Sequence, residues 1–293
     1  MKEQDVLRRF LFEELGIRGE WVKLTQSWQQ AKSHQQGDEA IQQQLGQALV
    51  AVVMLSATIK FKGSMILQTQ GDGHIQTLVA QSTEDKKIRG LVRARENAPP
   101  NAQDNLFGQG QLVLTVTSDN NQPYQGIVPL QTSNLAASLE MYFSQSEQLK
   151  TRLWLFANET DAAGLFIQEL PEQDRASVYD HDAWDRIEIL ANTITSQEIL
   201  DLDAEDLLHR LFHEEQVRLF DPEPVEFYCR CSRQLIEKTL RAMGRAELED
   251  ILQEQGAIEV DCEFCGKHYS FDQVDVEAIL VPDGVSPPSN TRH

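Results

Sequence analysis

Apolar residues recur at steps of three and four between Ala40 and Ser56, which is the period of an α-helix. The stripe consists of Ile41, Leu45, Leu49, Val52 and Val53. This spacing predicts an amphipathic helix whose apolar side packs on a core. Its most apolar part, 49–55, is much shorter than the ~20 residues that cross a bilayer, so we expect no membrane span.

The segments that follow this helix have the composition of β-strands. Residues 64–70 and 75–81 are separated by Gly71-Asp72-Gly73, which predicts a hairpin. Further strands are expected at 87–93, 111–118 and 125–130, a helix at 133–148, and a second hairpin at 151–158 with 163–169. Mixed strands and helices of this kind predict an α+β domain over residues 1–177.

The composition changes after Pro171. Residues 178–224 hold 13 acidic and three basic residues, so their net charge of −10 is half of the chain's −20. Leu207, Leu208, Leu211 and Phe212 lie at helical spacing, and Asp203 is placed to cap that helix. We expect an acidic helical linker whose self-repulsion opposes the folded form, so that its packing depends on the neighbouring domains.

The last segment, 225–293, contains all four cysteines of the chain. A helix is expected from Ser232 to Met243, where Gly244 ends it. The stretch from Val281 onward is rich in Pro, Ser and Gly and is expected to form a loose tail. The predicted organisation is therefore an α+β domain (1–177), a linker (178–224) and a small C-terminal domain (225–293).

Composition and charge narrow the classes of function. The chain has 293 residues, 41% of them hydrophobic and 25% charged, as in soluble globular proteins. Its strongly negative charge would repel a nucleic acid backbone, and the last segment alone has a net charge of −6. The N-terminus is charged from Lys2 and lacks a signal core, so we expect a cytoplasmic protein whose cysteines are reduced.

The cysteines form two close pairs, Cys229-Arg230-Cys231 and Cys262-Glu263-Phe264-Cys265-Gly266, with 30 residues between them. Residues two apart in an extended segment point the same way, and CxxC followed by Gly can form a tight turn, so the pairs can converge on one tetrahedral ion. Four thiolates suit zinc best, with Cys229, Cys231, Cys262 and Cys265 as ligands. A thiol exchange centre and unrelated buried cysteines are the alternatives, and His268 is a weaker candidate ligand.

A zinc site in so small a domain would have energetic consequences. The domain is marginal on its apolar core alone, whereas structural zinc contributes about 10 to 16 kcal/mol to such modules. Loss of the metal should therefore unfold it. An oxidised sulfur is lost as a thiolate ligand, so oxidation and zinc release are chemically coupled. The plainer alternative is a closed structural site with no further role.

Two motifs closely resemble the bacterial redox-regulated 33 kDa heat-shock chaperone family, the 33 kDa chaperonins. They are Phe227-Tyr228-Cys229-Arg230-Cys231-Ser232 and Cys262-Glu263-Phe264-Cys265-Gly266-Lys267-His268-Tyr269, with Leu211-Phe212-His213-Glu214-Glu215 preceding them. Residues 66–93, with Ile88-Arg89-Gly90, are similar to the N-terminal domain of that family, so the resemblance extends over nearly the whole chain.

The resemblance implies a substrate-binding domain, a metastable linker and a redox-switch domain that holds one zinc ion per chain when reduced. The reduced form would be inactive. Oxidation would form the neighbour disulfides Cys229–Cys231 and Cys262–Cys265, release zinc, unfold the switch and linker, and yield a homodimeric holdase that needs no ATP and acts in heat and oxidative stress. Its partners would be unfolding proteins, and it would not be an enzyme.

Opening of the linker would expose apolar residues to such client proteins, while its acidic residues would keep the open form soluble. The candidate client-binding residues are Ile187, Ile189, Leu190, Leu207, Leu208, Leu211 and Phe212. An ordinary helical connector with a solvated acidic face is the alternative for this segment.

Two rival functions remain open. One is a thiol-disulfide oxidoreductase that uses Cys262 and Cys265, and the other is a constitutive zinc-stabilised interaction module. A metalloprotease motif is absent from the His213-Glu214-Glu215 sequence, because Val217 stands where HExxH requires the second histidine. We interpret this trio as a cluster on a helix surface.

Overall fold

A computed structural model describes residues 2–95, 106–118, 121–130, 134–171 and 182–281. The chain splits into two compact units, Met1–Tyr228 and Cys229–His293, and each is described here by itself. The described part of the predicted linker lies within the first unit. The division of roles among the three predicted segments remains a prediction.

The first unit contains two six-stranded sheets among its described residues. In the sheet that we call sheet A, the order is β10-β1-β2-β9-β8, with β11 also paired to β1. All its pairs are antiparallel, and the predicted second hairpin is confirmed as β8–β9. The strands are β1 (Val6–Phe12), β2 (Ile17–Leu24), β8 (Thr151–Ala157), β9 (Ala162–Glu169), β10 (Val217–Leu219) and β11 (Glu223–Pro224).

The other sheet, sheet B, has the order β12-β5-β4-β3-β6-β7. The predicted first hairpin is confirmed as the antiparallel pair β3–β4, and β12 pairs with β5 in parallel. The strands are β3 (Gly63–Gly71), β4 (Ile75–Thr83), β5 (Lys87–Ala94), β6 (Gly110–Ser118), β7 (Asn121–Pro129) and β12 (Glu226–Phe227).

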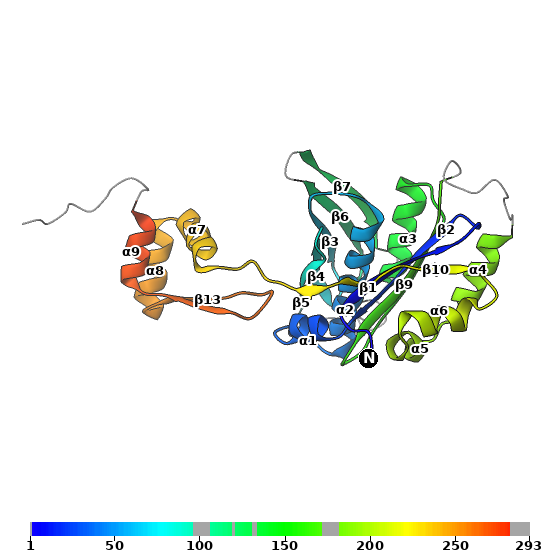
Figure 1. Cartoon of the computed structure of the whole chain (residues 1–293). Coiled ribbons are helices and arrows are strands. Elements are labelled where there is room, and N and C mark those ends of the chain that lie inside the picture. The colour runs from blue at the N-terminus through cyan, green and yellow to red at the C-terminus, as the bar shows by residue number, and fades with distance from the viewer. Residues whose placement is uncertain (1, 96–105, 119–120, 131–133, 172–181, 282–293) are drawn as a thin grey trace, which may run out of the picture. The chain divides into compact units, whose positions relative to one another are not determined.

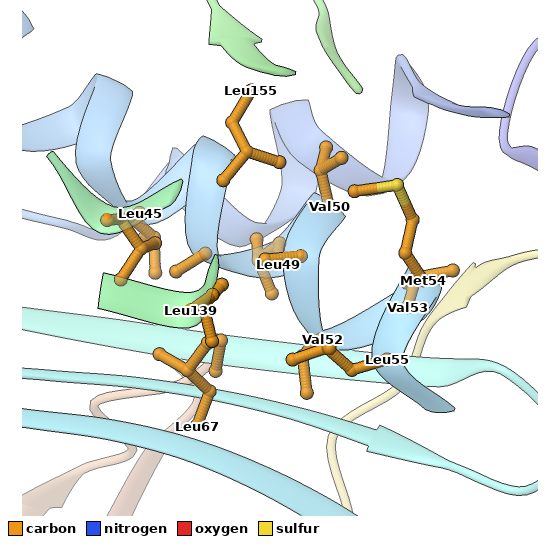
Figure 2. Packing of buried hydrophobic residues seen from close by; sticks show 14 of the residues in the cluster. Leu45, Leu49, Val50, Val52, Val53, Met54, Leu55, Leu67, Leu139 and Leu155 are labelled. Carbon is orange, nitrogen blue, oxygen red and sulfur yellow. The ribbon is translucent and has the colours of Figure 1, made fainter. Parts of the chain in front are cut away.

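Helix α2 (Glu39–Thr58) confirms the helix predicted from the apolar stripe and contacts strands of both sheets. Because it lies between two sheets, its middle is buried on every side rather than along one stripe. Figure 2 shows Val52 on the side of Leu67 from β3, whereas Val50 lies on the side of Leu155 from β8. This helix is long and apolar enough to cross a membrane by length and composition, but 72% of that window is buried inside the protein.

The remaining helices of the first unit cover the sheets. They are α1 (Gln26–Lys32), α3 (Leu135–Ser146), α4 (Ala183–Ala191), α5 (Ser196–Asp201) and α6 (Ala204–Phe212). The helices α4, α5 and α6 belong to the predicted linker and gather beside sheet A (Figure 1). Their apolar side chains form a second core with Phe10, Phe12 and Trp21, on the face of sheet A opposite α2.

The linker is not helical throughout, because β10 and β11 pair with β1. The prediction of a helical linker is therefore correct for α4, α5 and α6 but does not include the two short strands that follow them. The edge of β1 offers main-chain groups that an extended segment can satisfy, and residues 217–219 and 223–224 occupy that edge.

The second unit is a small α+β module. Its helices are α7 (Arg233–Met243), α8 (Arg245–Gln255) and α9 (Gln273–Leu280), and its hairpin joins β13 (Ile258–Asp261) to β14 (His268–Phe271). The predicted helix from 232 is confirmed: the Ser232 hydroxyl accepts from the Leu235 amide, and Gly244 ends the helix with φ of 93°. The core of this unit consists of Leu240, Leu248, Ile258, Tyr269, Phe271, Val276 and Ile279.

Candidate metal centre

The four cysteines of the second unit converge at one place. Their sulfur atoms all lie within 4.8 Å of one another, and each residue is half-buried. The Sγ atoms of Cys229 and Cys262 are 3.7 Å apart, and those of Cys231 and Cys265 are 3.3 Å apart. Four sulfurs around a tetrahedral zinc at about 2.3 Å would be about 3.8 Å apart, so the donor set and its spacing fit zinc.

Local backbone structure brings the two pairs together. Cys229 and Cys231 precede α7 in a segment without helical structure, so both thiols can face the same side. Cys262 follows β13 and opens a tight turn: its carbonyl accepts from the amides of Cys265, at 3.2 Å, and Gly266, at 2.7 Å. Gly266 has φ of 65°, a conformation that glycine adopts without steric cost.

The surroundings shift the acidity of the thiols in the metal-free chain. Burial opposes ionisation of Cys231, but hydrogen bonds from Tyr269 and the neighbouring thiols outweigh it and lower its pKa to about 7. Burial is the largest cause that raises the pKa of Cys262 and of Cys265. One thiol of the cluster is thus poised to ionise near neutral pH, whereas two others need a cation to hold them as thiolates.

Sequence reasoning missed Tyr269, whose hydroxyl donates to the sulfur of Cys231 at 3.3 Å. It lies on β14 directly after His268, and no spacing rule marks a tyrosine as a partner of a thiolate. The imidazole of His268 lies instead between two carboxylates, 2.7 Å from Asp261 and 2.8 Å from Glu259. The cluster that can hold a metal consists of the four cysteines without this histidine.

The sulfur contacts also bear on disulfide formation. The recorded contacts join one pair to the other, Cys229 to Cys262 and Cys231 to Cys265, at distances of separate thiols. All four sulfurs are nonetheless within 4.8 Å, so either pairing is reachable once the metal leaves. The neighbour pairing expected from the family resemblance remains a prediction.

The candidate client-binding residues lie far from the cysteines in the sequence, in the first unit. Most are fully buried on sheet A, and the rings of Phe212 and Phe12 meet edge to face with centroids 4.9 Å apart. Leu190 is partly buried, whereas the side chain of Ile189 is 66% exposed. This surface would therefore become available to a client only if α4 and α6 left the sheet.

Comparisons with known proteins agree over almost the whole chain. The family model described as Hsp33 protein matches residues 5–272. A protein of Nitrosococcus oceani named 33 kDa chaperonin is 54% identical over all of both chains. Another of that name, from Shewanella woodyi, is 44% identical over 279 residues, which cover 94% of this chain and 96% of that one.

A solved structure shows the same fold. The crystal structure of the 33 kDa chaperonin, or heat shock protein 33 homologue, of Thermotoga maritima superposes with a TM-score of 0.79 at 24% identity. It covers 94% of this chain and 98% of that one. The family match and the curated relatives together establish that this chain belongs to the Hsp33 family.

Proposed function

We propose that this protein is a chaperone whose binding of unfolding proteins is switched on by oxidation of a four-thiolate zinc centre. The observation that carries the proposal is the convergence of Cys229, Cys231, Cys262 and Cys265 within 4.8 Å. The family supports a chaperone, because its curated members are named 33 kDa chaperonin. Such a chaperone has no catalytic role, and the cysteines are its sensor.

In the reduced form, one zinc ion held by the four thiolates keeps the second unit folded. The apolar core of that unit is small, so the free energy of metal binding makes up much of its stability. The unit follows β12 directly, and β10, β11 and β12 attach the end of the linker to β1 and β5. A folded second unit therefore limits the freedom of the chain that enters these short strands.

Oxidation removes the ligands two at a time. One thiolate attacks a peroxide oxygen, which gives a sulfenic acid and hydroxide, and the neighbouring thiolate then displaces a second hydroxide to form the disulfide. Each disulfide thus delivers two electrons to one peroxide molecule, and two disulfides consume all four ligands. We propose Cys229–Cys231 and Cys262–Cys265 as the products, in accord with the short spacing in each pair.

Loss of zinc would then unfold the second unit and release the linker from sheet A. Release would present the buried apolar residues of α4 and α6 to a client, together with the exposed Ile189. The 13 acidic residues of 178–224 would keep this open chain in solution. By the same family resemblance we propose a homodimer as the oxidised form and the cytoplasm as its location.

The test measures zinc content and suppression of client aggregation on one sample, before oxidation by peroxide or hypochlorite, after it, and after thiol reduction with added zinc. We expect about one zinc per chain to leave as holdase activity appears, and reduction to reverse both. Retention of zinc, or zinc loss without gain of client binding, would reject the switch and favour a constitutive zinc-stabilised module. Turnover of a disulfide substrate by zinc-free protein would instead favour an oxidoreductase.

A further inference from the structure

Two histidines of α6 lie one helical turn apart on its exposed side. His209 and His213 are both exposed, their ring centroids are 6.1 Å apart, and the ring planes differ by 67°. Residues at i and i+4 share one face of a helix, which is the arrangement by which helical histidine pairs hold zinc in enzymes. The pair is separate from the incomplete HExxH motif at 213–217, because its second histidine precedes His213 by four residues.

The neighbours of the pair favour a cation. Glu205 lies one turn before His209 on the same exposed side, so its carboxylate adds negative charge near the pair. In the described parts of the chain, neither imidazole is held by a carboxylate, and the nearby guanidinium of Arg210 is paired with Glu198 of α5. The surrounding segment has a net charge of −10, which raises the local concentration of cations.

We propose that His209 and His213 form a second metal site that binds a divalent transition metal ion, with zinc as the reference ion. Imidazole ligands suit Zn²⁺, and the remaining positions would be filled by water. This site is chemically distinct from the four-thiolate centre, because no sulfur takes part. It binds an added ion weakly and reversibly, as expected of two ligands on an exposed helix.

The site would act on the linker through the helix itself. Both histidines reach one ion only while residues 209–213 are helical, so the ion binds the folded segment in preference to the open one. The opposite side of α6 carries Leu207, Leu208, Leu211 and Phe212, which are buried on sheet A. A bound ion therefore stabilises the packed linker, and this consequence, unlike the binding itself, rests on the proposed function.

The binding test uses full-length, reduced protein with its thiolate centre already loaded with zinc. Further Zn²⁺ is added in a calorimetric titration, which we expect to reveal one additional, weaker site per chain. His209→Gln and His213→Gln should each weaken that site on the order of 100-fold, because a chelate becomes a single ligand. Glu205→Gln should weaken it less, and His34→Gln, which removes an exposed histidine of the first unit far along the chain from α6, should leave it unchanged.

Glutamine has good helix propensity, so these variants keep α6 intact while removing the ligand. Absence of a second site, or a zinc affinity that neither histidine substitution changes, would overturn the proposal. Hydrogen exchange of the α6 amides, with and without the added zinc, separates binding of the ion from its effect on the linker. Binding without added protection would reject the effect on the linker and leave the site. Because this test needs neither oxidant nor client, its result is independent of whether oxidation activates the protein.

Discussion

Glu3 and Asp203 are joined across 200 residues of sequence: the Glu3 amide donates to the Asp203 carboxylate at 2.9 Å. In return, the Glu3 carboxylate accepts from the amide of Ala204, the first residue of α6, also at 2.9 Å. Asp203 occupies the cap position as the sequence predicted, but its side chain makes no capping hydrogen bond. The N-terminal segment therefore supplies the cap of a linker helix.

Replacement of Glu3 by alanine should loosen α6 without touching its apolar side. The variant leaves the Ala204 amide without its acceptor and removes an ion pair with Arg8, which should destabilise the packed linker by about 1 kcal/mol. Hydrogen exchange of the α6 amides in reduced protein measures this directly. Glu13→Gln, an exposed carboxylate in the turn after β1, is the matched control. Unchanged exchange in Glu3→Ala would show that the cap contributes nothing to linker packing.

A change at Phe12 tests whether packing of the linker suppresses client binding. Phe12 is fully buried on β1 against Phe212, and it is not itself a candidate client contact. Phe12→Ala should remove about 3 to 5 kcal/mol of packing between sheet A and α6. We expect the reduced, zinc-bound variant to suppress client aggregation without oxidant.

The control for that experiment must exclude general unfolding. Hydrogen exchange of the α2 amides, which belong to the other core of the first unit, reports whether that unit stays folded, and Phe12→Leu provides a milder cavity. Protected α2 amides together with a released linker and no gain in client binding, in either variant, would refute the suppression model.

Patterns with a short period predicted much of the fold. Elements that depend on neighbouring residues are confirmed. They are the helix at 39–58, the two hairpins, and the N-cap and C-terminal glycine of α7. The convergence of the cysteines was also predictable, because CxC and CxxCG fix the direction of each pair locally. What the pattern at 41–53 could not predict was burial of α2 on all sides, which requires both sheets to be in place.

Contacts between distant segments were not predictable from any local pattern. Three such contacts join residues that share no periodicity. They are the pairing of β10 and β11 with β1, the capping of α6 by Glu3 and the hydrogen bond from Tyr269 to Cys231. The net charge of the linker also did not predict which basic residues outside it would pair with its carboxylates. Arg152 and Arg9, outside the linker, reach Glu188 and Glu223 at 2.6 Å and offset part of its repulsion.

Glu20 should make the first unit less stable as the pH rises. Its carboxyl is buried on β2, and one of its oxygens has no hydrogen-bond partner among the described residues. Burial raises the pKa of Glu20 to about 8. The charges of Arg18, Arg9 and Lys86 oppose this shift, and that of Glu223 adds to it. In the unfolded chain this group ionises near pH 4.5. Between those values only the unfolded state loses its proton, so the stabilisation present below pH 4.5 is lost as the pH rises towards 8.

Glu20→Gln removes this titration while keeping the shape of the side chain. We expect the free energy of unfolding at pH 7 to rise by roughly 1 to 3 kcal/mol, and its decline between pH 5 and 8 to flatten. Denaturant unfolding followed by tryptophan fluorescence measures both quantities. Glu84→Gln, an exposed carboxylate in the turn after β4, is the control. The same pH slope in Glu20→Gln as in the unaltered chain would contradict the assignment.

Cys262→Ser tests the four-ligand assignment. Loss of one thiolate should weaken zinc binding by at least about tenfold and leave the second unit partly unfolded in reducing conditions. Competition with a chelator measures the affinity, and circular dichroism measures the helices α7 to α9. Ser232→Ala, next to the cluster but without a sulfur, controls for local disturbance of the α7 cap. Tight, stoichiometric zinc in Cys262→Ser would show that three thiolates suffice.

Tyr269→Phe should change the chemistry of one thiol without removing a ligand. The Tyr269 hydroxyl donates to Cys231 at 3.3 Å, and it is the first of the hydrogen bonds that lower the pKa of that thiol to about 7 against the effect of burial. Without the donor, the pKa of Cys231 should rise, so less thiolate is present at neutral pH and peroxide should react more slowly with metal-free protein. The pH dependence of the ultraviolet thiolate absorbance measures the shift.

The ring of Tyr269 belongs to the core of the second unit, and phenylalanine preserves it, so zinc affinity should stay within a few-fold. An unchanged thiolate titration would mean that the neighbouring sulfurs alone set the acidity of Cys231.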